Sequence, residues 1–594
     1  MLKRTALTPA TISLWLVGLL AVIPFLVSRH RYPIASFHSE WWAALLGVLA
    51  LVPLLQRDLW RDFSLPYRFV LPTGLLLLVL LQLNLYSINY PQSYFLFALY
   101  LLWAALLMAL GATLRQQVDE ERLATVLSAF LLAGALLSAL TGLIQHFHIP
   151  TPFNGMIMSK VAPEVYGNLA QHNHFANYSS LGLVAVAWLW LRYPQGLLVW
   201  VAASLLLLFV IGLSASRTAW FYIAAFIVMA AIYRLRDRDT GNRLLAITVF
   251  FLAGFVLMQY LGSIVSDWAG VASYTIQEKI GDRVGGASPR AQLWTVGKEI
   301  FLHHPWLGAG VGQFAWQHFL LGDTVGQRVE TGVYFTNAHD IVLMLLAELG
   351  IFAGLLLVIS ALTWVWAYVR QPWTPARLWL LMLLAVEGIH ALLEYPMWYT
   401  FFLGLTAFWL GYGDPQRLRV RLSRLGRLAL WLILLSAGYA LANLMVYDRV
   451  LEELTAKRYH IASFNAKQRE DYLNGLRRVR ENSLLAPYVD QIYTGMVEVE
   501  NKDVRTKVEF MQSAEEFAPT NTVVYKQAAL LALAGAEAQA ERQLRLASVS
   551  YPRDLPAVQQ RLLEQSEDEP RLAALAAYAT QLLMEKKASV VRAK

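Results

Sequence analysis

Cysteine and charged residues are the two classes that this chain lacks or uses sparingly. No cysteine occurs in its 594 residues, so no disulfide framework, thiolate metal site or cysteine nucleophile is available. Charged side chains make up 15% of the chain, whereas 57% of the residues are hydrophobic and 20 are tryptophan. A soluble domain does not carry that much apolar surface. The composition therefore indicates a protein that crosses a membrane many times.

Apolar runs of about 17–25 residues, the length that spans a bilayer, recur along the first part of the chain. They predict spans near residues 12–28, 41–56, 67–85, 94–114, 123–146, 175–192, 196–213, 217–233, 243–262, 338–369, 377–394, 397–413 and 427–446. We therefore expect an all-α, polytopic membrane protein with about 12–14 transmembrane helices. The first run has no small-residue cleavage pattern after it, so we interpret it as a retained span and not as a signal peptide.

Basic residues between the runs fall on alternate loops, which sets the expected orientation. The clusters are Lys3/Arg4, Arg57/Arg61/Arg68, Arg115/Arg122, Arg192, Arg234/Arg236/Arg238/Arg243, Arg370/Arg377 and Arg417/Arg419/Arg421/Arg424/Arg427. Because basic loops stay in the cytoplasm, we expect a cytoplasmic N-terminus, with loop 263–337 and residues 447–594 on the other side. That tail holds 21 basic and 21 acidic residues, so the net charge of +8 lies in the membrane part. Topology explains this excess, and nucleic-acid binding need not be invoked.

Residues 447–594 are expected to form a separate helical domain, after a transmembrane domain of residues 1–446. The stretch NTVVYKQAALLALAGAEAQAERQLRLASVSYP has Ala and Leu at helical spacing, a turn at Ala534-Gly535 and a Tyr-Pro stop. This pattern is typical of one helical hairpin of a tetratricopeptide-type (TPR-like) array. One hairpin predicts helices, but it leaves the repeat class open.

Four polar clusters are expected on the outer side of the membrane. GNLAQHNHFANY precedes the sixth span, loop 263–337 is the longest, FTNAHD begins the tenth span, and HALLEYPMW ends the eleventh. A single His or Asn at such a place is more often a helix cap or a solvated loop residue, and Arg217 in SASRTAW could be a snorkelling arginine. Arg217 nevertheless lies on the outer side, against the positive-inside bias, and is a candidate functional residue.

The chemistry of these clusters favours binding of an anion. Several arginines accompany the histidines, without cysteine, an acidic pair at metal-ligand spacing or a nucleotide loop, and guanidinium groups bind diphosphates through paired hydrogen bonds. His390 and Glu394, four residues apart on one helix face, offer two metal ligands without an evident third. Gly308, Gly310 and Gly312 resemble a phosphate-binding loop, but no strand precedes them, which favours a tight turn.

Together these motifs resemble those of the Wzy_C superfamily of O-antigen ligases, O-antigen polymerases and PglL-type bacterial protein O-oligosaccharyltransferases. The resemblance covers residues 10 to 445 and is strongest to the PglL type, because AQHNH is combined with LEYP, with PFLVSRHRYPIASFHSEW near the start and with a large helical tail. His172 stands where that family often has Arg or Asn. Asp340 stands where Asn is common.

The resemblance implies a glycosyltransferase of the bacterial inner membrane with a periplasmic active site. It would move a glycan en bloc from undecaprenyl diphosphate to a Ser or Thr hydroxyl of a pilin-like protein, with neither a metal nor a nucleotide cofactor. Arg217 and Arg290 would hold the diphosphate, with Arg283 a weaker candidate, and His339 would be the general base. The substrate-binding residues would be Gln171, Asn173, His174, His390, Glu394 and Tyr395.

Other acceptors and another class of protein remain open. A ligase would use the same residues to transfer polymer to lipid A–core, and a polymerase would use a second lipid-linked glycan. The soluble tail favours a protein acceptor. A transporter of lipid-linked glycans would also have many spans, but it would distribute polar residues through the spans and to both sides.

Overall fold

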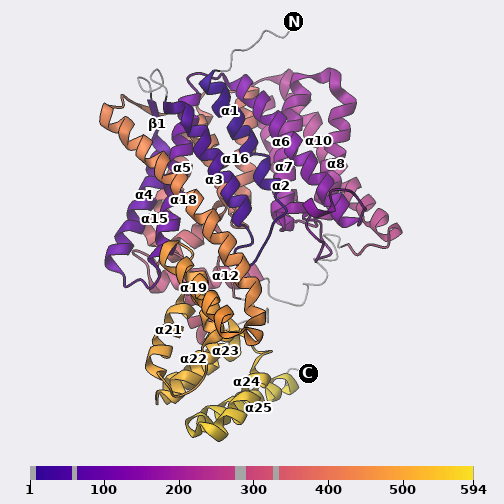
Figure 1. Cartoon of the computed structure of the whole chain (residues 1–594). Coiled ribbons are helices and arrows are strands. Elements are labelled where there is room, and N and C mark those ends of the chain that lie inside the picture. The colour runs from indigo at the N-terminus through magenta and orange to yellow at the C-terminus, as the bar shows by residue number, and fades with distance from the viewer. Residues whose placement is uncertain (1–7, 56–62, 274–288, 326–333, 593–594) are drawn as a thin grey trace. The chain divides into compact units, whose positions relative to one another are not determined.

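The computed structural model describes residues 8–55, 63–273, 289–325 and 334–592. Helices dominate the described chain, and its one sheet has two short strands (Figure 1). The chain divides into two compact units. The first comprises Met1–Leu76, Leu99–Gly285 and Leu356–Met445, and the second comprises Leu77–Ala98, Gly286–Leu355 and Val446–Lys594. The prediction of an all-α, polytopic fold is confirmed, whereas the predicted division at residue 446 stays a prediction.

Every predicted span coincides with a helix. The helices of the first unit are α1 (Pro9–Leu20), α2 (Ile23–Leu26), α3 (Phe37–Leu51), α6 (Glu120–His146), α7 (His172–Arg192), α8 (Leu197–Leu213), α9 (Thr218–Arg234), α10 (Arg238–Trp268), α16 (Pro375–Ala391) and α17 (Thr400–Gly413). Four more contribute to both units: α4 (Val70–Leu85), α5 (Pro91–Leu114), α15 (Ile341–Val369) and α18 (Arg424–Lys457). In the described residues, eight helical segments are long and apolar enough to cross a membrane. The other five predicted spans fall on the shorter or more polar helices α3, α7, α9, α16 and α17, so the exact number stays a prediction.

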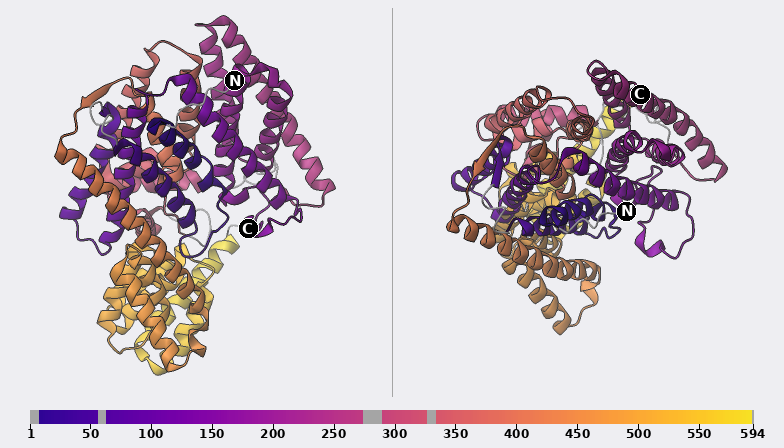
Figure 2. Two further views of the ribbon diagram at one scale, coloured as in Figure 1. Left: turned by 45° about the horizontal axis from the view of Figure 1, so that its top comes forward. Right: turned by 90° about the horizontal axis from the view of Figure 1, so that it is seen from above.

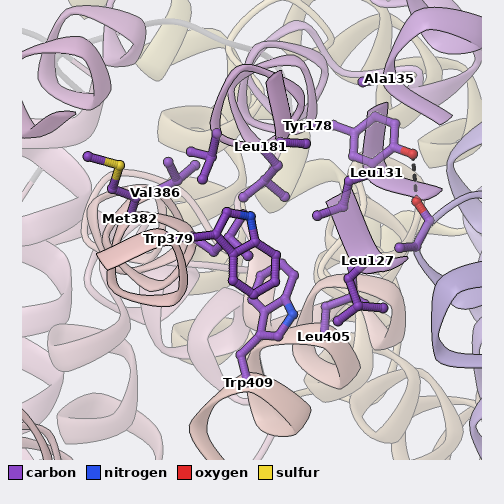
Figure 3. Close-up of a cluster of buried hydrophobic side chains, with 14 of the residues drawn as sticks. Leu127, Leu131, Ala135, Tyr178, Leu181, Trp379, Met382, Val386, Leu405 and Trp409 are labelled. Atoms are coloured by element: carbon purple, nitrogen blue, oxygen red, sulfur yellow. Dashed lines mark hydrogen bonds between the residues drawn. The ribbon is translucent and has the colours of Figure 1, made fainter. Parts of the chain in front are cut away.

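The core of the first unit lies where α6, α7, α16 and α17 meet. Figure 3 shows Leu127 of α6 and Leu181 of α7 among the side chains that pack with Trp379 and Trp409 of the other two helices. Tyr178 donates a hydrogen bond of 2.5 Å to the Ala21 carbonyl oxygen in this cluster. Such mixed aromatic and aliphatic packing fixes the relative rotation of the helices, and thereby decides which polar side chains meet.

Close backbone approach adds a second constraint on packing between α5 and α17. A Cβ atom on Gly411 would lie 2.0 Å from the carbonyl oxygen of Met108, and one on Gly111 would lie 2.3 Å from that of Phe408. Small residues at such crossings let two membrane helices come into direct backbone contact. The two glycines therefore set the spacing of α5 and α17.

Ion pairs and a small sheet lie at one end of the first unit. Glu120 Oε1 is 2.9 Å from both Arg115 Nη2 and Arg377 Nε, which ties together the ends of α5, α6 and α16. Strand β1 (Phe63–Pro66) pairs antiparallel with β2 (Arg417–Val420). The sequence analysis did not predict this ladder, because two four-residue strands far apart in sequence give no recognisable alternation.

The second unit contains the C-terminal helices and part of the long loop. Its own helices are α12 (Pro289–His303), α13 (Phe314–Leu320), α14 (Gly322–Val325), α19 (Ala466–Asn482), α20 (Ala486–Met496), α21 (Val504–Phe517), α22 (Asn521–Leu533), α23 (Glu537–Ser550), α24 (Leu555–Asp568) and α25 (Ala573–Arg592). Most consecutive C-terminal helices pack against each other, among them α21 with α22, α22 with α23 and α24 with α25. Figure 2 shows these helices as a bundle coloured orange to yellow. The predicted turn is present, with Gly535 at φ 81° between α22 and α23. Phe319 of α13 is buried with residues of α22 and α23, so the loop packs on the C-terminal helices.

Helix α15, which corresponds to the span predicted near 338–369, is broken at Gly350. Gly350 has φ 75° and ψ −169°, a conformation that favours glycine. A Cβ atom there would lie 2.2 Å from the carbonyl oxygen of Trp306, and the N–H of Ile351 donates to Pro305 O instead of continuing the helix. The predicted span corresponds to this helix, but its break was not predicted, because it depends on the loop before α13, which passes directly against this point.

Candidate functional site

The polar segment before α7 is an ordered helix start. Ala170 has φ 60°, which turns the chain into the helix. Gln171 is the N-cap residue, and its side-chain oxygen accepts the His174 N–H at 2.6 Å. The preceding turn is held by Asn168, whose Nδ2 donates to the carbonyls of Leu26 and Met156. One predicted substrate-binding residue, Gln171, therefore uses its oxygen to cap the helix.

Asn173 joins three separate parts of the first unit. Its Nδ2 donates to Glu394 Oε1 at 2.6 Å, and its Oδ1 accepts from Ser216 Oγ at 2.7 Å. Ser216 also lies 2.7 Å from the Thr218 hydroxyl. Asn173 is 8% exposed and Glu394 is 2% exposed. The amide thus satisfies a buried carboxylate and a hydroxyl at once, which only a group with both a donor and an acceptor can do.

His174 and His390 form a second buried chain beside the first. His174 Nδ1 lies 2.8 Å from His390 Nε2, and His390 Nδ1 lies 2.9 Å from the Tyr222 hydroxyl. The rings of Tyr395 and Tyr399 contact the His174 ring edge-on. Both ring nitrogens of His390 take part in hydrogen bonds with protein groups. This role differs from the metal coordination that the sequence analysis considered for His390 and Glu394.

Arg217 lies between two members of this network. Ser216 and Thr218, its neighbours in sequence, make the hydrogen bonds described above, and Arg217 itself immediately precedes α9 and is partly exposed. A guanidinium held at this place by a rigid turn can bind an anion that reaches the rim of the buried network. The structure thus brings together seven predicted residues: Gln171, Asn173, His174, Arg217, His390, Glu394 and Tyr395.

Arg290 and His339 belong to the second unit. His339 has φ 54°, and its N–H donates to Asn337 Oδ1 at 2.8 Å. Asp340 then caps the start of α15, because its Oδ1 accepts the Leu343 N–H at 2.9 Å. A left-handed, non-glycine residue held by such a turn is a common feature of functional sites. His339 therefore stands at a fixed helix start, as the sequence predicts.

Arg290 is in the first turn of α12, which packs next to the His339 turn. A Cβ atom on Gly297 would lie 3.6 Å from the Ala338 Cβ. Arg290 precedes Gly297 by seven residues and so lies on the same face of α12. Arg283, the third predicted arginine, lies outside the described residues.

The glycine-rich loop of residues 308–312 is a tight turn, as predicted. Gly308, Gly310 and Gly312 all have positive φ. Phe314 N–H donates to the Glu348 carboxylate at 3.3 Å, and Gly310 N–H donates to the Glu348 carbonyl oxygen at 3.1 Å. The loop thus bonds to the backbone of α15, and the first residue of α13 bonds to the Glu348 carboxyl group.

Sequence reasoning missed several buried polar residues near these predicted ones. Ser216 and Tyr222 complete the networks of Asn173 and His390, and Asn177 and Glu387 lie beside them. In the second unit, burial lowers the pKa of His318 to about 4, and its ring and that of His339 contact Phe335. Only Glu387 had a usable signal, since it is an ionisable residue within a predicted span.

Comparison with known proteins decides the family. The chain is 30% identical over 413 residues to the general O-oligosaccharyltransferase of Acinetobacter baylyi, covering 68% of this chain and 70% of that protein. It belongs to the O-oligosaccharyltransferase family. The chain is also 24% identical over 380 residues to the ComP-specific O-oligosaccharyltransferase of the same organism, and the match covers 64% of this chain and 67% of that relative. The expectation of a glycosyltransferase is thereby confirmed.

Three family matches lie along the chain. Residues 165–190 match a protein glycosylation ligase family, and residues 202–358 match the O-antigen ligase family. Residues 378–564 match the C-terminal part of a virulence factor membrane-bound polymerase family. The protein glycosylation match covers α7, which carries Asn173 and His174. The resemblance to the Wzy_C superfamily, and within it to the protein glycosylation type, is confirmed.

Proposed function

We propose that this chain transfers a glycan en bloc from undecaprenyl diphosphate to a Ser or Thr hydroxyl of a pilin-like protein. Its relatives are protein O-oligosaccharyltransferases. The observation that supports the proposal for named residues is the buried network of Asn173, Ser216 and Glu394, which lies next to Arg217. Of these residues, Asn173 lies in the segment that matches protein glycosylation ligases. A rigid, hydrogen-bonded polar site beside a guanidinium suits a substrate with both sugar hydroxyls and phosphates.

In the proposed reaction, the acceptor oxygen forms a bond to the anomeric carbon of the glycan. The bond between that carbon and the phosphate oxygen breaks, and undecaprenyl diphosphate leaves with the bonding electrons. Arg217 and Arg290, with Arg283 in support, stabilise the charge that develops on the diphosphate. His339 takes the hydroxyl proton as general base. Asn173 and His174 orient the polar groups of the substrates.

The proposed localisation is the bacterial inner membrane, with a cytoplasmic N-terminus and a periplasmic active site. Residues 1–446 form the transmembrane domain and residues 447–594 a periplasmic helical domain. Support comes from the alternation of basic loops described above. Alkaline phosphatase fused at Gly332 or after Val446 should be active, and inactivity of both fusions would reverse the orientation.

The acceptor is tested by co-expressing the chain with a lipid-linked glycan pathway and a pilin-like protein. Intact mass measurement should find glycan on the protein and none added to lipopolysaccharide. The O-antigen ligase match over residues 202–358 gives a second candidate, transfer to lipid A–core. Glycan found on lipopolysaccharide alone would establish that second function and reject the first. A Wzy-type polymerase would instead lengthen the lipid-linked glycan.

The diphosphate site is tested by changing Arg217 or Arg290 to Lys. Each change keeps the positive charge but removes the planar pair of donors, so transfer should fall although the protein still inserts. Full activity of both variants would exclude these arginines from the site.

A further inference from the structure

The loop of residues 147–166, which leads from α6 toward α7, carries large apolar side chains on its surface. The exposed fractions are 43% for Ile149, 63% for Phe153, 65% for Met156 and 82% for Val161. Exposed apolar side chains gathered on one short segment are typical of a surface that binds a protein or a membrane. None of these four residues has a role in the reaction proposed above.

Hydrogen bonds from buried side chains hold the backbone of this loop in place. Asn168 Nδ2 donates to the Met156 carbonyl oxygen at 2.9 Å, and the Met158 N–H donates to Asn168 Oδ1 at 3.0 Å. The Val161 N–H donates to the Tyr166 hydroxyl at 2.6 Å. Asn168 and Tyr166 are both buried. Because the loop bonds to the core through its backbone, its apolar side chains are held at the surface.

The C-terminal ends of α6 and α10 lie at the same level as the loop. Lys160 Nζ donates to the Ala272 carbonyl oxygen at 3.1 Å, four residues after the end of α10. His146, the last residue of α6, has its Nε2 atom 2.9 Å from Ser266 Oγ. Trp268, the last residue of α10, is 85% exposed. All of these residues belong to the first unit, so this end of the unit presents both the loop and Trp268.

The lengths of the two helices place this level at a membrane surface. Helix α6 has 27 residues and α10 has 31, so they are about 40 Å and about 46 Å long. A bilayer with its headgroup regions is about 40–45 Å thick. Both helices begin with charged residues, Glu120 and Glu121 in α6 and Arg238 and Asp239 in α10. Their other ends therefore reach the opposite membrane surface, where tryptophan is enriched.

The loop also continues the lipid-facing surface of α6. Leu137 and Leu140 of this helix are about half exposed, and exposed apolar side chains on a membrane-spanning helix contact lipid. Leu140 lies six residues before the end of α6, which is about 9 Å along the axis. The charged residues of the loop are Lys160 and Glu164, which have opposite signs. An apolar loop without net charge, directly above a lipid-facing surface, favours lipid as the partner.

We propose that residues 147–166 form an interfacial loop, which lies in the membrane surface on the side of the candidate site. Its apolar side chains enter the boundary between headgroups and acyl chains, as Trp268 does at the end of α10. Asn168, which holds the loop, precedes the α7 cap Gln171 by three residues. The loop thereby fixes the depth of the polar network relative to the lipid. This inference rests on the membrane-spanning fold and not on glycan transfer.

The first test measures the depth of single labels, which the absence of cysteine from the chain makes possible. Met156→Cys and Val161→Cys each receive one nitroxide label in the full-length protein, reconstituted in phosphatidylcholine and phosphatidylglycerol nanodiscs. Collision rates are then measured with oxygen, which concentrates in lipid, and with a nickel chelate, which stays in water. Leu137→Cys is the lipid control, and Gln539→Cys, an exposed position of α23, is the water control.

We expect the ratio of oxygen to nickel collisions at Met156 and Val161 to exceed that at Gln539 about threefold or more, in the direction of Leu137. Ratios at both loop positions equal to that at Gln539 would overturn the inference.

The second test removes apolar side chains from the loop and follows the label at Val161. The double change Ile149→Ser, Phe153→Ser should lower the ratio of oxygen to nickel collisions, because the loop then loses apolar groups that hold it in the membrane surface. The matched control is Phe221→Ser, Val228→Ser, since both residues are exposed apolar side chains of α9. The control should leave the ratio unchanged. An unchanged ratio in the loop variant would overturn the inference.

An acceptor protein is the other possible occupant of this surface. Labels at Met156 and Val161 that meet the nickel chelate in nanodiscs, and become protected from it when a pilin-like protein is added, would assign the surface to the acceptor. That result would overturn the lipid contact. A wild type that glycosylates no protein refutes the proposed function and leaves the collision measurements standing.

Discussion

Replacing Asn173 with aspartate would place two carboxyl groups face to face in the buried network. The new oxygen would take the place of Nδ2, 2.6 Å from Glu394 Oε1. Two full charges at that distance repel by about 6 kcal/mol at an effective dielectric constant of about 20. Binding one proton at pH 7 to a carboxyl group of ordinary pKa costs only about 4 kcal/mol. The pair should therefore bind a proton, which limits the loss of stability to about 4 kcal/mol.

This reasoning predicts a characteristic pH dependence. In Asn173→Asp, the protonated new side chain donates to Glu394 and accepts from Ser216, as Asn173 does, so the protonated variant is intact. The folded pair holds a proton that the unfolded chain releases, so stability relative to the wild type falls as pH rises. The deficit should shrink by about 1.4 kcal/mol for each pH unit below 7, until it vanishes near the ordinary carboxyl pKa.

The assay is thermal unfolding and glycan transfer of the purified protein at about pH 7.5 and about pH 5.5. The double variant Asn173→Asp, Glu394→Gln exchanges the two groups. The new amide at position 394 then donates to the new carboxylate at position 173. It should recover most of the stability at pH 7.5 and lose the pH dependence. An Asn173→Asp single variant as stable as the wild type at pH 7.5, or a double variant no better than the single, would refute the reasoning.

Three further predictions concern other parts of the chain. His339→Ala should lower the transfer rate about 10²–10⁴-fold while the amount of protein in the membrane stays normal. His148 is exposed, so the control His148→Ala should lower the transfer rate little. A transfer rate of His339→Ala within about threefold of the wild type would rule out His339 as the base. Burial raises the pKa of Glu515 to about 8, so the folded state holds a proton that the unfolded state releases between pH 4.5 and 8, and stability falls across that window. Amide hydrogen exchange in α21 and α23 should therefore be slower in Glu515→Gln than in the wild type at about pH 8.5, and equal in the two proteins below about pH 4.5. Exchange rates that are equal in the two proteins at both pH values would contradict this. Gly411→Ala should lower the unfolding temperature because its Cβ would lie 2.0 Å from Met108 O. The control Gly438→Ala has open space at its Cβ and should be neutral or stabilising by up to about 1 kcal/mol. Equal unfolding temperatures of the two variants would show that α5 and α17 can move apart.

Much of the candidate site could be recognised from residue type and position along the chain. The arginines and histidines between apolar runs identified Arg217, His339 and the AQHNH segment as exceptions to a membrane composition. His339 in FTNAHD was predicted at a helix start, and the structure places the next residue, Asp340, as a cap there. Gln171 was predicted to bind substrate, and the structure shows that it caps α7. These features depend on local sequence, since hydropathy and capping act over a few residues.

The pairing of side chains could not be predicted in this way. Asn173 meets Glu394 across 221 positions, and His174 meets His390 across 216. A helical pattern shows which residues share a face, but the partner of that face depends on how several helices pack. Ser216 and Tyr222 were missed for this reason, because a serine or tyrosine in an apolar run has no distinguishing local signal.

The sequence by itself determined the helices, the membrane character, the turn at Gly535 and the residue types available for anion binding, because each depends on local composition and spacing. The break of α15 at Gly350 was decided by the carbonyl of Trp306, which lies against it. The β1–β2 ladder joins strands about 350 residues apart in the chain, a contact that only tertiary packing can bring about. Local sequence likewise leaves open whether Asn173 is a solvated cap or the centre of a buried network. The packing of α7, the turn before α9 and the end of α16 decides this, because burial and hydrogen-bond partners are properties of the packed structure.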